Sequence, residues 1–198
     1  MSCSVGALNA AYHTKMGVYH HEMGIKKGGK LAIMAGAGPM GLGALTYALH
    51  RDVRPSMVVV TDVNEDRLAR AEALFPPAEV KEKDGIDLHF VNTGKMADPA
   101  AELREMTGGT GFDDVFCYAP VAAVVELCSA VLGRDGSGAV GGVVVVDVHG
   151  RLGQHAAEVV DHLADGDGLV VAGYDDGHAF AREGGLVGFS HRALLRES

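Results

Sequence analysis

Short apolar runs alternate along the chain with longer segments in which apolar residues recur every three or four positions. The runs predict strands at 31–35, 57–60, 88–91, 115–118, 142–146 and 169–172, and the periodic segments predict helices at 39–49, 64–74, 120–132 and 152–163. Asn64 and Asp98 are placed to cap helices, and Pro99 opens one that Gly108 ends. Because the strands are apolar throughout, both faces of their sheet must be covered. We therefore predict a doubly wound α/β domain, a single Rossmann-type unit with a six-stranded, mainly parallel sheet and helices on both faces.

The first 29 residues precede this alternation, and we interpret them as an N-terminal helix and approach segment. Apolar residues recur at steps of three or four from Leu8 to Met23, which predicts a helix over 5–23 that ends at Gly24. The dinucleotide-type domain is then expected to span residues 30–198.

The loop GGTGFDD at 108–114 leads into the fourth predicted strand. Its glycines predict a flexible connection, and Asp113 and Asp114 are expected to be solvated. Cys117, in the apolar strand that follows, is expected to lie in the core.

Charge and cysteine content disfavour several classes of protein. The formal net charge of −9 argues against nucleic-acid binding, which needs clustered Lys and Arg. We expect neither membrane insertion nor secretion, because no apolar run approaches the length of a membrane span and no signal-peptide pattern is present. Cys3, Cys117 and Cys128 lack metal-ligand spacing and favour a reducing compartment, so a cytoplasmic location is predicted.

The segment GAGPMG at 36–41 joins the first predicted strand to the first predicted helix. Gly36, Gly38 and Gly41 have the G-x-G-x-x-G spacing, which permits a sharp turn, close approach of the backbone to a pyrophosphate, and tight packing of helix on strand. Unpaired N–H groups in the first helical turn and the helix dipole stabilise an anion at such a place. We interpret the segment as a dinucleotide site, with a purely structural turn as the alternative.

The next predicted strand ends in Asp62, at about the expected 20 residues beyond Gly41. A carboxylate there accepts hydrogen bonds from the adenosine ribose hydroxyls, and its charge opposes the 2'-phosphate of NADP. No basic residue follows before Arg67. NAD is therefore the predicted cofactor, and NADP is less favoured. A methyltransferase also combines a glycine turn with an acidic residue, but its glycines typically alternate, unlike the spacing after Gly38.

The residues alone predict no catalytic group. The chain lacks the Tyr-x-x-x-Lys relay of short-chain dehydrogenases, and His21 with Glu22 is not followed by the second histidine of a zinc helix. His20 and His21 are interpreted as surface histidines. His149, just beyond the fifth predicted strand, is the histidine best placed for chemistry, although a non-catalytic role is favoured there.

Five segments, in order, resemble the cofactor-binding half of the zinc-dependent medium-chain alcohol and polyol dehydrogenases, in a sorbose-phosphate reductase-like branch. They are YHTKMGVYHHEMGIKKGGKLAI, GAGPMGLGAL, VVTDVNEDRLARAEALFPP, HFVNTGKM and GGTGFDDVFCYAPVAAVVE, within about residues 2–136, and the resemblance fades beyond them. The resemblance implies a six-stranded dinucleotide domain that often dimerises through its last strand. It also implies a pyrophosphate site at Gly36, Gly38, Pro39, Met40 and Gly41, a ribose contact at Asp62, and a nicotinamide side at Ala119, Pro120 and Val121.

In that family a separate domain carries the zinc ligands and the proton relay, and this chain begins within what resembles the family's middle. No zinc is therefore expected, and no catalytic residue is assigned. The leading hypothesis is a stand-alone or truncated NAD(H)-binding module without the groups for efficient hydride transfer. One alternative is an active NAD-dependent oxidoreductase subunit completed by another chain. The other is a structural or interaction protein with a vestigial nucleotide site.

Overall fold

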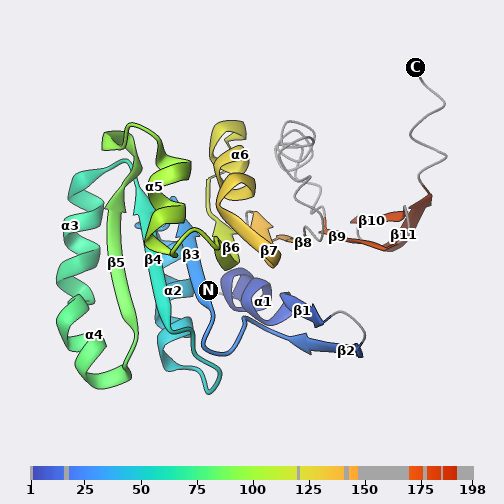
Figure 1. Cartoon of the computed structure of the whole chain (residues 1–198), viewed down its shortest axis with the longest axis horizontal. Coiled ribbons are helices and arrows are strands. Elements are labelled where there is room, and N and C mark those ends of the chain that lie inside the picture. The colour runs from blue at the N-terminus through green and yellow to red at the C-terminus, as the bar shows by residue number, and fades with distance from the viewer. Residues whose placement is uncertain are drawn as a thin grey trace.

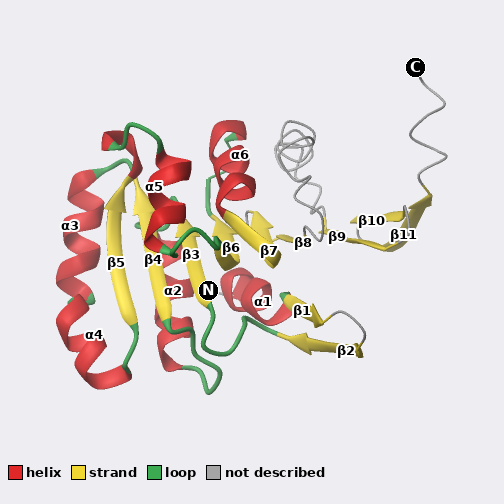
Figure 2. Cartoon of the chain, in the orientation of Figure 1, coloured by secondary structure: helices red, strands yellow, loops and turns green. Residues whose placement is uncertain are grey.

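The computed structural model describes residues 2–15, 18–119, 121–140, 143–146, 170–175, 178–183 and 185–190. Helices flank the central strands on both sides (Figure 2). In chain order the elements are α1 Ser2–Ala10, β1 Tyr12–Lys15, β2 Val18–Met23, β3 Lys30–Met34, α2 Pro39–His50, β4 Met57–Asp62, α3 Glu65–Leu74, α4 Pro77–Asp84, β5 Asp87–Asn92, the 3-10 helix η1 Thr93–Lys95, α5 Pro99–Met106, β6 Phe112–Cys117, α6 Ala122–Val131, β7 Leu132–Val140, β8 Val143–Val146, β9 Val170–Asp175, β10 His178–Glu183 and β11 Gly185–Ser190.

The strands β3 to β11 form one nine-stranded sheet in the order β11-β10-β9-β8-β7-β6-β3-β4-β5 (Figure 1). Within this sheet, β7, β6, β3, β4 and β5 run parallel to one another. Counted along the chain, these strands have the order 3-2-1-4-5, so the direction of winding reverses between β3 and β6. This arrangement confirms the predicted doubly wound α/β fold.

The sheet differs from the six-stranded prediction beyond β6. β7 has no predicted counterpart, because LGRDGSGAV contains no apolar run, and β8, the predicted fifth strand, pairs antiparallel with β7. The predicted sixth strand is β9, which pairs parallel with β8 and antiparallel with β10. The edge on this side is therefore β11, and assembly of copies through the sixth strand stays a prediction. The predicted helix at 152–163 lies outside the described residues.

Each face of the central strands packs into its own core. Leu31 and Ile33 of β3 lie in a cluster with residues of α1 and α2, and Ala32 and Met34 lie in a second cluster with residues of α5 and α6. Successive residues of a strand point to opposite faces, so a strand buried on both sides is mainly apolar, with Thr61, Asp62 and Asp114 as buried polar exceptions. Cys117 is buried in the second cluster, which confirms its predicted place in the core.

The N-terminal segment corrects the prediction of a helix over 5–23. α1 ends at Ala10, and β1 and β2 then pair antiparallel, with Tyr12 opposite Met23. The N–H of Gly24 donates to the carbonyl of Ala11 at 2.6 Å and closes the ribbon. A glycine in a helix interior costs about 1 kcal/mol, and Gly17 would occupy that place in a continuous helix.

The predicted helix starts are confirmed at two caps. The side chain of Asn64 accepts from the N–H of Arg67 at 3.0 Å, and that of Asp98 accepts from the N–H of Ala101 at 3.0 Å. α4 has no counterpart among the predicted helices, since it is short and separated from α3 by only two residues.

Candidate dinucleotide site

The glycine turn runs from the end of β3 to the start of α2 and is attached to the end of β4. The N–H of Gly36 donates to the carbonyl of Thr61 at 2.7 Å, and the N–H of Ala35 donates to Thr61 Oγ1 at 3.3 Å. Ala35 has a φ of 52°, a left-handed conformation that a non-glycine residue seldom adopts. The sharp change of direction therefore falls at the topological switch point of the sheet.

The three motif glycines occupy different surroundings. A Cβ on Gly36 would lie 2.4 Å from Ile33 Cγ2, and one on Gly41 would lie 2.2 Å from the carbonyl oxygen of Gly36. A Cβ on Gly38 would have no atom of the described residues within 4 Å. Packing within the protein thus demands the first and third glycines, whereas the second faces open space beside the helix. This is the distribution expected when a ligand approaches the middle glycine.

The N-terminus of α2 offers backbone donors toward that space. No side chain caps the helix, whose N-cap residue is Gly38, and Pro39 in the first position has no N–H. The N–H groups of Met40 and Gly41 belong to the first turn, where no preceding carbonyl of the helix can accept from them. Ser4, which is buried in α1, donates to the Met40 carbonyl at 3.1 Å and fixes the turn from behind.

Asp62 joins the glycine turn to the loop after β4. Its Oδ1 accepts from the N–H groups of Val63 at 2.9 Å and Asn64 at 3.0 Å, and its Oδ2 accepts from the N–H of Ala37 at 3.3 Å. The residue is only 6% exposed. A carboxylate oxygen that accepts one long hydrogen bond keeps acceptor capacity, which suits a ribose hydroxyl.

The residues predicted for the nicotinamide side lie at the carboxyl end of β6. The N–H of Tyr118 donates to the Met34 carbonyl at 3.0 Å, so this end of β6 runs beside the end of β3 that leads into the turn. Ala119 and Val121 follow, and Val121 donates to the Ala119 carbonyl at 2.8 Å. Pro120 lies outside the described residues.

Exposed apolar side chains surround the turn. Met40, Val63 and Val121 are 43%, 70% and 52% exposed, and each comes shortly after the carboxyl end of a central strand. Large apolar side chains of this kind are normally buried. Here all three are exposed at the end of the sheet that carries the glycine turn.

Two other features are candidates for a functional site. His149 lies outside the described residues. An open hollow of about 420 Å³ lies at the edge strand β5, beside α4, and the strand β4 separates β5 from β3. Its charged lining is largely paired within itself, because Asp87 contacts both Lys81 Nζ at 3.3 Å and His89 Nε2 at 3.4 Å. We assign no ligand to this hollow.

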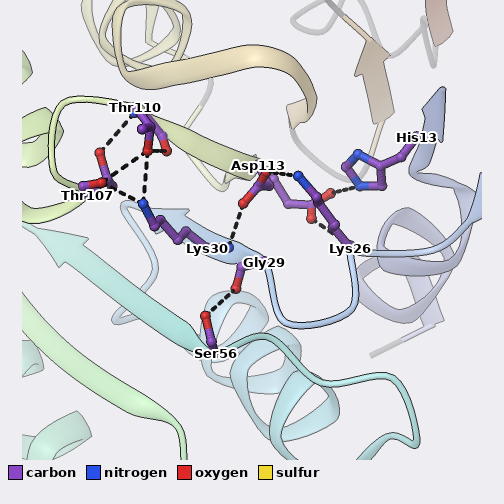
Figure 3. A network of polar contacts seen from close by, with 10 residues as sticks. His13, Lys26, Gly29, Lys30, Ser56, Thr107, Thr110 and Asp113 are labelled. Carbon is purple, nitrogen blue, oxygen red and sulfur yellow. Dashed lines mark hydrogen bonds and ion pairs between the residues drawn. The ribbon is translucent and has the colours of Figure 1, made fainter. Parts of the chain in front are cut away.

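A buried polar network at the amino ends of β3 and β6 corrects the prediction that Asp113 and Asp114 are solvated (Figure 3). Asp114 is 1% exposed, and it contacts His13 Nε2 at 3.0 Å and accepts from the Lys26 N–H at 2.9 Å. Asp113 pairs with Lys26 Nζ and accepts from the Lys30 N–H at 2.9 Å. The partners come from the approach segment, far away in sequence, so no local pattern indicates the network.

The charges of this network shift two pKa values. Burial disfavours a charged His13, but the hydrogen bond and the charge of Asp114 outweigh it and raise the pKa of His13. Burial disfavours ionised Asp113, but hydrogen bonds from Lys26 and Lys30 outweigh it and lower the pKa of Asp113. The network thus stabilises protonated His13 and ionised Asp113.

Among the residues whose structure is described, no helix has the length and apolar character needed to cross a membrane.

Known proteins align with more than half of the chain. The family model of the zinc-binding dehydrogenases matches residues 39–162. Mannitol-1-phosphate 5-dehydrogenase of Aliivibrio fischeri is 53% identical over 136 residues, which are 69% of this chain and 32% of the relative. L-sorbose 1-phosphate reductase of Klebsiella pneumoniae is 39% identical over 136 residues, with the same shares of 69% and 32%. The chain spans about a third of the length of these curated relatives.

Among solved structures, 2R,3R-butanediol dehydrogenase of Bacillus subtilis aligns with a TM-score of 0.47 at 23% identity, over 70% of this chain and 33% of the other.

Proposed function

We propose that this chain, which belongs to the zinc-binding dehydrogenase family, binds NAD(H) at the GAGPMG turn and serves as the cofactor-binding half of a polyol-type dehydrogenase. One observation carries the proposal. The space next to Gly38 is free of protein atoms within 4 Å of a Cβ there, and it lies beside the uncapped start of α2. Such a place accepts a pyrophosphate without rearrangement.

The surrounding groups support one orientation of the dinucleotide. The N–H groups of Met40 and Gly41 would donate to the pyrophosphate, and Oδ2 of Asp62 would accept from an adenosine ribose hydroxyl. Val63 and Val121 would contact the two rings from opposite sides of the turn. The nicotinamide ring accepts or donates a hydride when the cofactor is bound. The residues of this chain hold and orient the cofactor.

Asp62 supports NAD over NADP. A 2'-phosphate would add negative charge where the carboxylate is already held by three backbone N–H groups. These hydrogen bonds fix the carboxylate in place, so it cannot swing away from a phosphate. A neutral ribose hydroxyl, in contrast, donates to the same oxygen.

The substrate class follows from the relatives by analogy. The names of two of them refer to mannitol 1-phosphate and L-sorbose 1-phosphate, so we propose a sugar or polyol phosphate as the substrate of the complete enzyme. Zinc does not fit the described residues, which contain no group of three His, Cys, Asp or Glu side chains able to hold a metal ion. We assign no reaction step to a metal in this chain.

Calorimetric titration with NADH, NADPH and S-adenosylmethionine tests the proposal. We expect saturable binding of NADH, weaker binding of NADPH and none of S-adenosylmethionine. Gly38→Val should reduce NADH affinity about a hundredfold, because the new side chain fills the pyrophosphate space and separates the phosphate from the N–H donors. Its unfolding temperature should change little, since a Cβ at this position meets no atom of the described residues within 4 Å.

The matched control is Gly6→Val, at a glycine in α1 that also has no protein atom within 4 Å of a Cβ. This variant should bind NADH like the wild type. Equal NADH affinities of Gly38→Val and the wild type would contradict the proposed site, and binding of S-adenosylmethionine in place of NADH would contradict the proposed cofactor.

A further inference from the structure

The loop after β5 lies against the loop after β4, on the ribose side of the proposed site. Asp62 and Asn92 are register partners at the ends of these neighbouring strands. Asn92 Nδ2 donates to the Val63 carbonyl at 3.4 Å, and a Cβ on Gly94 would lie 3.6 Å from Val63 Cβ. The residues after Asn92 are therefore within reach of a group bound at Asp62.

The loop after β5 ends in a lysine whose ammonium group already has an ion-pair partner. Lys95, the last residue of η1, forms an ion pair with Oε1 of Glu65, which is the first residue of α3. Asn92 Nδ2 lies 3.5 Å from the same oxygen. The hydrogen bond and charge of Lys95 lower the pKa of Glu65, which favours the ionised form of this carboxyl group. Both side chains are largely exposed, at 69% for Lys95 and 59% for Glu65, and are thus accessible to a bound ligand.

We propose, on the basis of the NAD(H) site proposed above, that Glu65 is a specificity-determining residue that withholds Lys95 from the 2'-phosphate of NADP. The structure places the carboxylates of Asp62 and Glu65 at the two ends of one loop, and Lys95 of the adjoining loop is paired with Glu65. A 2'-phosphate entering here meets the charge of both carboxylates, and Lys95 is already paired with one of them. The selection against NADP thus has two parts, direct repulsion by Asp62 and sequestration of Lys95 by Glu65.

Sequestration of Lys95 by Glu65 should affect the binding of NADP(H) but not the binding of NAD(H). NAD(H) carries a hydroxyl at the 2' position, which needs an acceptor and gains nothing from a cation. NADP(H) carries a phosphate, which gains a charge-assisted hydrogen bond as soon as an ammonium group is free. Removing the Glu65 charge should therefore change the affinity for NADPH and leave the affinity for NADH unchanged.

Titration of four proteins with NADH and NADPH tests this inference. We expect Glu65→Gln to bind NADPH about five- to tenfold more tightly than the wild type, with NADH affinity within about twofold. In the double variant Glu65→Gln with Lys95→Met the gain should disappear. Glu79→Gln removes an exposed negative charge on α4 and serves as the control for net charge. The gain should decrease as salt rises from about 0.05 M to about 0.5 M, because a partly exposed ion pair is screened.

Each result tests either the role of Glu65 or the proposed NAD(H) site on which that role rests. Unchanged NADPH affinity of Glu65→Gln, in a protein that binds NADH, overturns the inference and leaves the proposed function intact. An equal gain in Glu79→Gln, or a gain that survives Lys95→Met, also overturns it, because net charge alone then explains the effect. Absence of NADH binding to the wild type overturns the proposed function and this inference together. Because Glu65 is exposed, an unchanged unfolding temperature of Glu65→Gln verifies that the variant is folded.

Discussion

The two ends of the same parallel strands differ in how their polar groups are used. At the amino ends of β3 and β6, Asp113 and Asp114 are surrounded by donors from Lys26, Lys30 and His13, so their carboxylates are engaged within the protein (Figure 3). At the carboxyl ends, backbone donors at the start of α2 face open space and apolar side chains are exposed. One end joins the approach segment to the sheet, and the other is free to bind a ligand.

The largest expected effect is the loss of stability when the amino end is broken. Asp114→Ala leaves His13 and the Lys26 N–H without their buried acceptor, which should lower the free energy of unfolding by about 3 kcal/mol. Denaturant unfolding measures the change, with Asp52→Ala at an exposed carboxylate as the control. The folded fraction should bind NADH normally, and a parallel loss of NADH affinity would show that the two ends are not independent.

A second prediction compares substitutions at two glycines of the same turn. Gly41→Ala forces a Cβ to within 2.2 Å of the Gly36 carbonyl oxygen, so the backbone must shift, and we expect a loss of about 2 kcal/mol in unfolding free energy. Gly38→Val should instead affect NADH binding alone. Thermal or denaturant unfolding of both variants, side by side, makes the comparison. If Gly38→Val proved the less stable of the two, the space beside Gly38 would have a structural role.

The smallest expected effect is a pH dependence confined to the amino end. The pKa of His13 is raised from its ordinary value of 6.5, so its contribution to stability is complete below that pH and is lost as pH rises through the folded-state pKa. The pKa of Asp113 is lowered from 3.8, so its contribution is present above that pH and is lost on acidification through the lower folded-state value. Both stabilising contributions are present between the two folded-state pKa values. The charged groups of Asp114 and Lys26 face His13.

Unfolding free energy should therefore fall from about pH 6 to pH 8, and His13→Gln should flatten this part of the profile. NADH affinity should stay constant over the same range, because the network lies at the opposite end of the sheet. An undiminished slope in His13→Gln would assign the pH dependence to another group.

Local patterns in the sequence were sufficient where neighbours along the chain decide the structure. The glycine turn, the caps at Asn64 and Asp98, and the buried strand around Cys117 depend on residues within a few positions of each other. The parallel order of the central strands then follows from right-handed crossovers. For these reasons the fold class could be predicted from the sequence, and the structure confirms it, whereas the ligand site at the turn stays a prediction.

Contacts between distant segments could not be derived in this way. His13 and Asp114 are 101 positions apart, so neither residue's local sequence indicates the other. The ribbon of β1 and β2 was predicted as helix because its apolar residues also match a helical period, and pairing between the strands decides the outcome. β7 is rich in glycine and polar residues, yet it pairs with β6 on one side and β8 on the other. Tertiary pairing overrides weak local preference in both cases.

The attachment of the glycine turn to β4 has a consequence for the thermodynamics of binding. Hydrogen bonds from Ala35 and Gly36 to Thr61, and from Ala37 to Asp62, join the two loops before any nucleotide arrives. The conformational entropy of these loops is lost when the chain folds. Ligand binding therefore does not carry the entropic cost of ordering them. In the proposed site, the fixed spacing of the two loops would match only one distance between phosphate and ribose. A ligand with a longer or shorter bridge between these groups could satisfy only one loop at a time.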